Sequence, residues 1–174
     1  MVMNEIEVKI LEIDAEDVQK RLKALGAKKI FDGEVSWTSF DFPAGRLSRE
    51  KMLRLRKVGD KAELTYKKLL STKGAKISEE IETKVADFEA TKKILVSIGL
   101  SEKRGYPLHK HRISYVLKNV RFEIDTFQDF PTYLEIEGPD QNTINQYVEK
   151  LGFALSQTKP WGVRELFAHY RDKS

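Results

Sequence analysis

The sequence predicts an α+β fold whose strands, about eight in number, are enough to form an antiparallel β-barrel with a charged lumen and flanking helices. Most of the 174 residues fall in short segments in which apolar and charged residues alternate, as they do in β-strands. Three other segments carry apolar residues at helical spacing between an Asp and a Gly. If the helices cover the apolar faces of the strands, the charged faces must turn toward the interior.

Segments with the pattern of a strand recur along the chain, and turn residues such as Gly59-Asp60 and Lys118-Asn119 separate some of them. The expected strands are residues 4–12, 28–31, 35–42, 51–58, 62–68, 77–85, 109–117, 120–127 and 132–138. In each expected helix, the Asp supplies the N-cap and the Gly ends the helix. The expected helices run from Asp14 to Gly26, from Asp87 to Gly99 and from Asp140 to Gly152, and a C-terminal tail follows.

Length and composition favour one ordered domain that spans residues 1–174. Hydrophobic residues make up 40% of the chain and charged residues 33%, which leaves enough apolar material for a core. No run approaches the roughly 18 apolar residues of a membrane helix. Glu5 and Glu7 stand where a signal peptide would have its apolar stretch. We therefore expect a cytoplasmic protein with no membrane partner.

The residue types present restrict the chemistry. The chain has no Cys and only three His, which excludes disulfides, thiolate nucleophiles and Cys-based zinc or iron–sulfur sites. A bound metal must therefore have oxygen ligands, and these favour Mg²⁺ or Mn²⁺ over Zn²⁺. The net charge of +4 is small and both signs are interspersed, so we expect no nucleic-acid partner.

The charged strand faces carry acidic and basic residues together. A Glu-Ile-Glu triplet occurs at residues 5–7, 80–82 and 135–137, each time before an expected helix. For any one strand, a charged face in water is the usual arrangement. With helices available to cover the apolar faces, the charged faces instead line the lumen. The expected lining residues are Glu5, Glu7, Lys9, Arg54, Arg56, Lys67, Glu80, Glu82, Lys110, Arg112, Glu123, Asp125, Glu135 and Glu137.

Such a lumen predicts a polyphosphate ligand. Charges crowded together away from bulk water are costly unless they are paired or bound to a ligand. Cations together with carboxylates that hold a metal are the chemistry of phosphoryl groups.

The order of these residues resembles that of the CYTH superfamily, the triphosphate tunnel metalloenzymes, which include class IV adenylyl cyclases and thiamine triphosphatases. Glu5-Ile6-Glu7-Val8-Lys9 matches the Glu-x-Glu-x-Lys signature at the N-terminus of the family. The later blocks follow in the order of the family: Leu53-Arg54-Leu55-Arg56, Thr65-Tyr66-Lys67, Glu80-Ile81-Glu82, Lys110-His111-Arg112, Asp125 and Glu135-Ile136-Glu137. The resemblance implies an eight-stranded antiparallel tunnel, a divalent metal bound by carboxylates, and phosphates bound by Arg and Lys.

The resemblance also implies a role for each charged position. The metal carboxylates are Glu5, Glu7, Glu135 and Glu137. The residues that contact phosphate are Lys9, Arg54, Arg56, Lys67, Lys110, Arg112 and Lys159. Asp125 and Lys9 are the catalytic candidates, Asp125 as the group that orders a metal or the attacking water. Glu80, Glu82 and Glu123 are expected to orient the cations, and a plain salt-bridge role is open for them. His109 and His111 alternate with Lys110 and Arg112, so they are expected on the other face of their strand.

Two segments depart from the pattern of the family. The segment Ser39-Phe40-Asp41-Phe42-Pro43 keeps three residues of a Tyr-Phe-Asp-Thr-Pro-like stretch. The segment Gly162-Val163-Arg164-Glu165-Leu166-Phe167 lacks the Ser-Tyr pair that many members carry. These departures leave the choice of substrate within the family open.

The sequence therefore predicts a Mg²⁺- or Mn²⁺-dependent enzyme whose partner is a small molecule that contains a triphosphate. It either cyclises ATP to cyclic AMP and pyrophosphate or hydrolyses a nucleoside, thiamine or inorganic triphosphate. One alternative is a nucleic-acid-binding β-domain, which the pI of 9.1 supports, although such a domain interleaves aromatic residues, not Glu, with its cations. Another is a non-catalytic polyphosphate-binding module. The oligomeric state is open.

Overall fold

The computed structural model describes residues 2–43, 47, 50–103, 109–128 and 130–171. Its strands are β1 (Val2–Ile10), β2 (Lys28–Asp41), β3 (Lys51–Val58), β4 (Lys61–Ser71), β5 (Lys76–Val85), β6 (Ser101–Glu102), β7 (His109–Leu117), β8 (Val120–Thr126), β9 (Tyr133–Gly138) and β10 (Thr158–Lys159). Its helices are α1 (Ala15–Ala24), α2 (Phe88–Ser97), α3 (Gln141–Lys150), the short 3₁₀ helix η1 (Leu155–Gln157) and α4 (Val163–Arg171). Among these helices none has both the length and the apolar character needed to cross a membrane.

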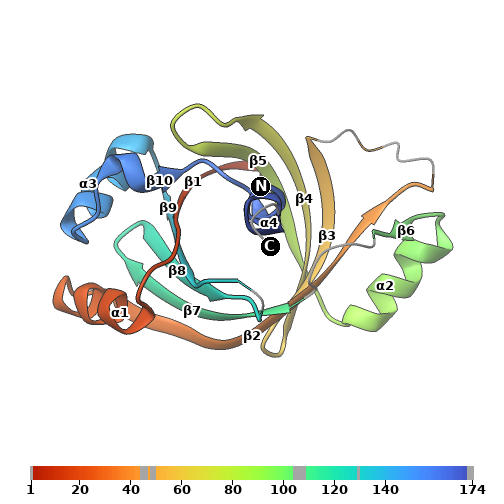
Figure 1. The fold of residues 1–174 in the computed structure, drawn as a ribbon. Helices are drawn as coiled ribbons and strands as arrows, with labels where there is room; N and C mark the ends of the chain where they lie inside the picture. The colour runs from red at the N-terminus through yellow and green to blue at the C-terminus, as the bar shows by residue number, and fades with distance from the viewer. Residues whose placement is uncertain (1, 44–46, 48–49, 104–108, 129, 172–174) are drawn as a thin grey trace. The chain divides into compact units, whose positions relative to one another are not determined.

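The hydrogen-bonded order of the strands closes on itself. The order is β10-β1-β5-β4-β3-β2-β7-β8-β9, β6 pairs with β2, and β1 also pairs with β9 (Figure 1). The pairs β1–β9, β2–β3, β3–β4, β7–β8 and β8–β9 are antiparallel. Without the two-residue strands β6 and β10, eight strands remain, and their order is that of an eight-stranded antiparallel β-barrel. Together with the helices, this barrel confirms the predicted fold class. That the charged faces enclose one lumen stays a prediction.

The chain divides into two compact units. The first unit comprises Met1–Asn4, Gly33–Leu70 and Ser78–Lys110. The second unit comprises Glu5–Asp32, Ser71–Ile77 and His111–Ser174.

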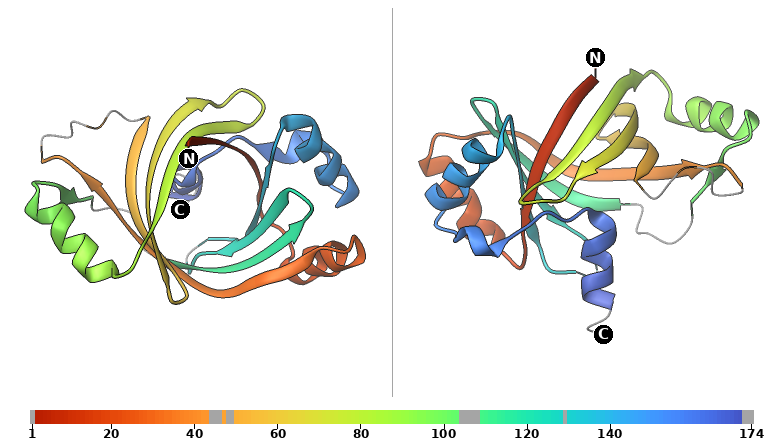
Figure 2. Two further views of the ribbon diagram at one scale, coloured as in Figure 1. Left: turned by 180° about the vertical axis from the view of Figure 1, so that it is seen from behind. Right: turned by 90° about the horizontal axis from the view of Figure 1, so that it is seen from above.

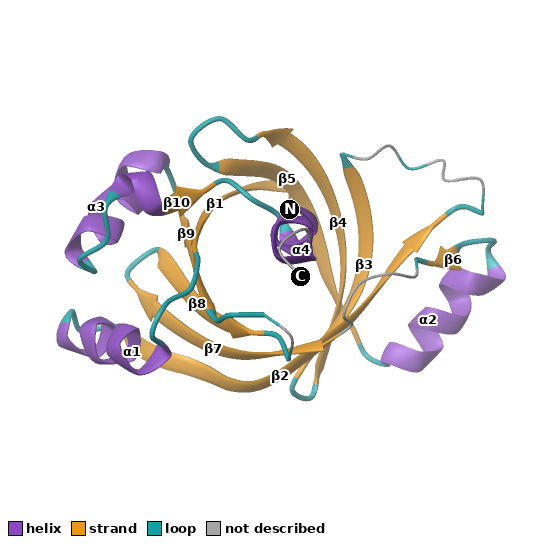
Figure 3. Ribbon diagram, in the orientation of Figure 1, coloured by secondary structure: helices purple, strands orange, loops and turns teal. Residues whose placement is uncertain are grey.

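The second unit has its core between the strands β1, β7, β8 and β9 and the helices α1 and α3, which lie beside these strands in Figure 3. Val18 of α1 and Ile144 of α3 are buried in this core together with Val8 of β1. The approach of α3 is close, because a Cβ built on Gly138 would lie only 2.9 Å from the side chain of Ile144. These contacts fix which face of β1 is apolar, and they leave the face of Glu7 to the charged side chains.

The first unit has a smaller core. Leu95 of α2 and Leu100 pack against Phe40 of β2 and Leu55 of β3, and Figure 2 shows α2 beside β6. Val85 of β5 also packs against this core, whereas Ile81 on the same face of β5 is 45% exposed. The apolar face of β5 is therefore only partly covered.

Three helices begin and end where the sequence predicts. The N-cap side chains each accept backbone N–H hydrogen bonds from the first turn: Asp14 from Glu16 and Asp17, Asp87 from Ala90, and Asp140 from Thr143. Past each helix lies a glycine with positive φ, namely Gly26 at 84°, Gly99 at 97° and Gly152 at 79°. This left-handed conformation ends a helix at little cost only when the residue is glycine.

Two expectations about secondary structure were wrong. The two expected strands 28–31 and 35–42 belong to one continuous strand, β2, which runs through Asp32. The carboxylate of Asp32 pairs with Lys29 at 2.7 Å and with His111 at 3.2 Å. The C-terminal tail contains the helix α4, whose Phe167 packs edge-to-face against Phe127 with ring centroids 5.2 Å apart.

Candidate functional site

Strand register brings the charged residues of the second unit into rows on one face of β1, β9, β8 and β7. Residues that lie directly opposite each other on neighbouring antiparallel strands have side chains within contact distance. The rows are Lys9–Glu135–Glu123–Ser114, Glu7–Glu137–Arg121 and Tyr133–Asp125–Arg112. The short strand β10 adds Lys159 opposite Lys9. All four predicted metal carboxylates belong to these strands, since Glu5 precedes Glu7 by two residues on β1.

Lys9 is enclosed by acids. Its side chain is 1% exposed, and its Nζ lies 2.9 Å from Oε1 of Glu7 and 2.5 Å from Oε2 of Glu135. Burial alone would lower the pKa of Lys9, but attraction to Glu135 and Glu7 outweighs it, so the pKa lies above its usual value. Lys9 therefore remains an ammonium that joins a carboxylate of β1 to a carboxylate of β9.

Arg112 is held in the same way. Its Nε and Nη2 donate to the two carboxylate oxygens of Asp125, both at 2.6 Å, and Nη2 lies 3.5 Å from Oε1 of Glu135. Such a two-pronged pair fixes both side chains. Burial would lower the pKa of Arg112, but Asp125 and Glu123 raise it above its usual value. Asp125 is fully buried and its orientation is set by Arg112.

Glu123 is a second carboxylate of β8 beside Arg112. It is 2% exposed, accepts a hydrogen bond from the hydroxyl of Ser114, and lies 3.5 Å from Nε of Arg112. Burial raises the pKa of Glu123, and Arg112 and Ser114 oppose this effect. Arg121, which is half exposed, approaches Glu123 to 3.7 Å.

Lys76 is a cation of this face that the sequence analysis missed. Its Nζ lies 2.8 Å from Oε1 of Glu7 and 3.9 Å from Oε2 of Glu5. The expected strand began one residue later, at residue 77. Extended by one residue, its alternation would have placed Lys76 on the face of Glu80.

We call the group of linked side chains in the second unit the acidic cluster; its members are Glu5, Glu7, Lys9, Lys76, Arg112, Glu123, Asp125 and Glu135. Within it, ion pairs join five carboxylates to three cations. Lys9 and Arg112 lie between the carboxylates, and the described residues contain no group of three or more acidic or histidine side chains already arranged around one point. The donors are nevertheless all oxygen and exceed the cations in number, which fits a hard divalent ion such as Mg²⁺ or Mn²⁺.

The first unit holds a second group, the arginine cluster, on β3, β4 and β5. Arg56 donates from Nη2 to Glu63 at 2.8 Å and lies 3.3 Å from Glu82. Lys67 lies 3.0 Å from Glu80, so Glu80 and Glu82 both pair with predicted phosphate contacts. The members of the arginine cluster are Arg54, Arg56, Glu63, Lys67, Glu80 and Glu82.

The arginine cluster contains buried donor atoms that lack an acceptor. In the described part of the chain, Nε of Arg56 and Nε and Nη2 of Arg54 are buried and have no hydrogen-bond partner, although both side chains make other contacts. A buried charged donor without an acceptor is costly. An oxyanion beside Arg56 would satisfy its Nε while Nη2 keeps its bond to Glu63.

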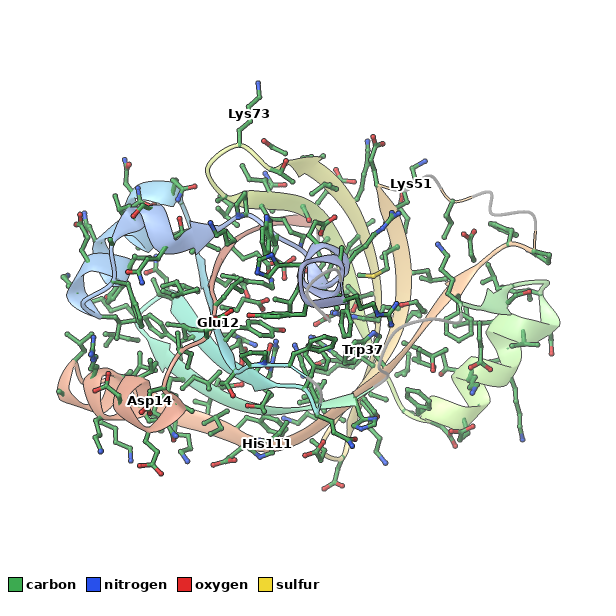
Figure 4. The ribbon with its side chains drawn as sticks, in the orientation of Figure 1. Glu12, Asp14, Trp37, Lys51, Lys73 and His111 are labelled. Atoms are coloured by element: carbon green, nitrogen blue, oxygen red, sulfur yellow. The ribbon has the colours of Figure 1, made fainter. Side chains whose placement is uncertain are left out.

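Lys110 is the remaining predicted basic residue of the first unit, and it lies beside Trp37. Nζ of Lys110 lies 5.9 Å from the centre of the Trp37 ring, which Figure 4 labels. Trp37 is opposite Arg56 in the register of β2 and β3, so the ring shares the face of the arginine cluster. The sequence analysis did not single out Trp37, although its parity in the strand 35–42 would have placed it there.

Three other residues have surface or structural surroundings. His111 is partly exposed and pairs with Asp32, as expected for the face opposite Arg112 (Figure 4). Asp41 accepts hydrogen bonds from the N–H groups of Phe42 and Leu47 and pairs with Lys103, so it organises the turn after β2. His109 is also exposed.

Lys159, the last predicted phosphate contact, lies on β10. Its Nζ is 5.8 Å from the centre of the Trp161 ring.

Comparison with known proteins gives the family. The model of the CYTH domain matches residues 3–160. The solved structure of the PH1012 protein from Pyrococcus horikoshii is similar, with a TM-score of 0.76 at 27% identity over 91% of this chain and 96% of that protein. A candidate adenylate cyclase from Vibrio parahaemolyticus has a TM-score of 0.82 at 14% identity over 94% and 97%. No curated protein sequence matches the chain.

A plant protein has the same fold. HpAC1 from Hippeastrum, a candidate adenylyl cyclase in which triphosphatase activity is dominant, has a TM-score of 0.66 at 16% identity over 98% of this chain and 96% of that protein.

Proposed function

This chain belongs to the CYTH family, whose members generally process triphosphates with a divalent metal, and on that premise we propose that it is a Mg²⁺- or Mn²⁺-dependent triphosphate hydrolase. The observation that carries the proposal is the acidic cluster, in which five carboxylates surround three cations on one strand face. Buried carboxylates in excess of their cations are the donors that a hard divalent ion requires.

Glu5, Glu7, Glu135 and Glu137 are the residues that would hold the metal. When bound, it would neutralise phosphate charge and favour ionisation of water. Asp125, held by Nε and Nη2 of Arg112, would accept a hydrogen bond from the attacking water and so orient it. Lys9 keeps Glu7 and Glu135 at a fixed separation and carries a positive charge that attracts the phosphates.

Arg54, Arg56 and Lys67 are the groups that would bind the triphosphate in the first unit. A guanidinium donates two parallel hydrogen bonds to phosphate oxygens, whereas an ammonium acts as a point charge. Glu63 and Glu82 hold Nη2 of Arg56 and thereby aim its Nε. Binding then requires little reordering of the side chain, which favours affinity.

Hydrolysis needs fewer groups than cyclisation. It needs phosphate contacts, a metal and an oriented water. The arginine cluster has side chains suited to phosphate, and the acidic cluster has side chains suited to a metal and to a water. Cyclisation would in addition require the ribose 3′-hydroxyl to be held in line with the α-phosphorus. The dominant triphosphatase activity of the similar Hippeastrum protein supports the same choice.

The test is a product assay. Purified protein is incubated with ATP, thiamine triphosphate and tripolyphosphate, each with Mg²⁺, with Mn²⁺ or with EDTA, and orthophosphate, pyrophosphate and cyclic AMP are separated. We expect orthophosphate that depends on the metal. Cyclic AMP with pyrophosphate would instead assign a cyclase, and binding without any product would assign a polyphosphate-binding module. A single-stranded oligonucleotide that displaces tripolyphosphate would favour the nucleic-acid alternative.

A further inference from the structure

Two ammonium groups converge on one oxygen atom of Glu7. Lys9 lies 2.9 Å and Lys76 lies 2.8 Å from the same Oε1. Lys76 also lies 3.9 Å from Glu5. Together the two lysines place two positive charges beside the Glu5–Glu7 pair, which is the charge of one divalent cation.

The two lysines are not equivalent. Lys9 is 1% exposed and has Glu135 as a second close partner. Lys76 is 17% exposed and is the first residue of β5. A long side chain that is partly exposed can change rotamer more easily than one that is fully enclosed. Lys76 is therefore the lysine whose ammonium can move away from Glu7.

Lys76 also has an acidic neighbour. A Cβ built on Gly162 would lie 3.7 Å from Cε of Lys76 and 3.0 Å from Oε2 of Glu165, so both groups flank Gly162. Glu165 accepts the N–H of Gly162 at 2.9 Å, which fixes its carboxylate there. An ammonium that moves away from Glu7 thus has an acid nearby to limit the cost of its displacement.

We propose that Lys76 is an internal counter-ion, which neutralises Glu5 and Glu7 when no metal is bound and is displaced when a divalent cation binds to them. This inference rests on the proposed function, because that proposal makes Glu5 and Glu7 metal ligands. Like charges a few ångströms apart repel strongly away from bulk water. Lys76 consequently lowers metal affinity and at the same time stabilises the metal-free protein.

The test compares Mn²⁺ binding by calorimetry, without phosphate, in the wild type, K76M, K76R and K73M. Lys73 is the matched control, because it is exposed in the connection between β4 and β5 and extends away from the ribbon in Figure 4. We expect K76M to bind Mn²⁺ about tenfold more tightly than the wild type. K76R keeps the charge and K73M leaves the site intact, so both should bind like the wild type.

Melting temperature supplies a second measurement. Metal-free K76M should melt at a lower temperature than the wild type, because Glu5 and Glu7 lose a counter-ion. Saturating Mn²⁺ should raise the melting temperature of K76M by more than it raises that of the wild type. If K76M does not fold, K76Q replaces it, since its amide can still donate to Glu7.

The outcomes separate this inference from the proposed function. If the wild type binds Mn²⁺ and K76M binds it equally or more weakly, Lys76 supports the ligands and the inference is wrong, while the proposed function stands. If neither protein binds Mn²⁺, both are wrong. If K76M binds Mn²⁺ and the wild type does not bind measurably, the inference is supported in its strongest form.

Discussion

Arg112 in the second unit and Arg56 in the first unit differ in what surrounds them. Arg112 is 11% exposed at its side chain, and its Nε and Nη2 both donate to Asp125. Arg56 is 18% exposed, donates from Nη2 to Glu63, and has no acceptor for Nε in the described part of the chain. Alternation in a strand places each of them on a charged face, but the partners across the strands differ.

This difference separates two uses of a buried cation. A cation that is held by a two-pronged pair with one carboxylate fixes the position of that carboxylate. A cation with a buried donor that lacks an acceptor is prepared for an anion. We therefore propose that Arg112 positions Asp125 and that Arg56 binds phosphate, although the family resemblance gave both the same role.

The largest expected effect is on stability. Arg112→Met leaves the fully buried Asp125 without its counter-ion, which should lower the free energy of unfolding by about 3–5 kcal/mol. Urea denaturation measures this change. Arg121→Met is the matched control on the same face, because Arg121 is 54% exposed and should cost about 0–1 kcal/mol. An equal loss in the two variants would mean that burial of the Arg112–Asp125 pair is not what stabilises the cluster.

The next effect is on metal-dependent turnover. Glu135→Gln keeps the size of the side chain and removes one proposed metal carboxylate, so activity at limiting Mn²⁺ should fall by about 100-fold or more. The variant also weakens the contact with Lys9, and its melting temperature should be measured alongside. Glu149→Gln, an exposed change on α3, is the control. Full activity of Glu135→Gln at limiting Mn²⁺ would exclude Glu135 as a ligand.

A smaller effect is expected on phosphate affinity. Arg56→Gln should weaken tripolyphosphate binding by about 1.5–3 kcal/mol, the range for a hydrogen bond to a charged group. Some stability should also be lost, because Arg56 holds Glu63. Lys57→Gln tests the specificity of the effect, since Lys57 is exposed on the other face of β3. Calorimetric titration that gives the same affinity for Arg56→Gln and the wild type would remove Arg56 from the binding site.

The smallest effect is expected at the surface. Asp32→Asn breaks the pairs with Lys29 and His111, which are about two-fifths exposed, and should lower the free energy of unfolding by less than about 1 kcal/mol. Neither metal affinity nor tripolyphosphate affinity should change. A loss as large as that of Arg112→Met would contradict the distinction between buried and exposed pairs on which the comparison depends.

Much of this arrangement follows from sequence patterns. Alternation predicted that Leu55 is buried while Arg56 lies on the charged face, and Leu55 is fully buried in the core beside α2. Asp14 and Gly26 predicted the ends of α1 because capping and positive φ are local properties. These features depend on residues that are close in the chain, which is why they can be read from it.

Pairings across strands could not be predicted in the same way. Register decides that Lys9 lies opposite Glu135 and that Arg112 lies opposite Asp125. Register is set by turns and by packing of the whole sheet, not by the residues of one strand. The family resemblance therefore predicted a charged face. It could not distinguish a cation that is paired with carboxylates from one that has a buried donor without an acceptor.

The helix α4 was missed for a related reason. Its buried residues Leu166, Phe167 and Tyr170 have helical spacing, but the segment is short and lacks the N-cap Asp that marks the start of the other three helices. Phe167 gains its partner Phe127 only in the folded chain. Tertiary packing thus stabilises a helix that its local sequence alone does not specify.

Mn²⁺ titration of two variants in the absence of phosphate tests the division between the two clusters most directly. We predict that Glu135→Gln loses Mn²⁺ affinity by at least about tenfold, because a carboxylate ligand is removed, while Arg56→Gln binds Mn²⁺ like the wild type. In a tripolyphosphate titration of the same proteins, Arg56→Gln should bind more weakly than the wild type. Retention of full Mn²⁺ affinity by Glu135→Gln, together with its loss in Arg56→Gln, would contradict the assignment of metal to the acidic cluster and of phosphate to the arginine cluster.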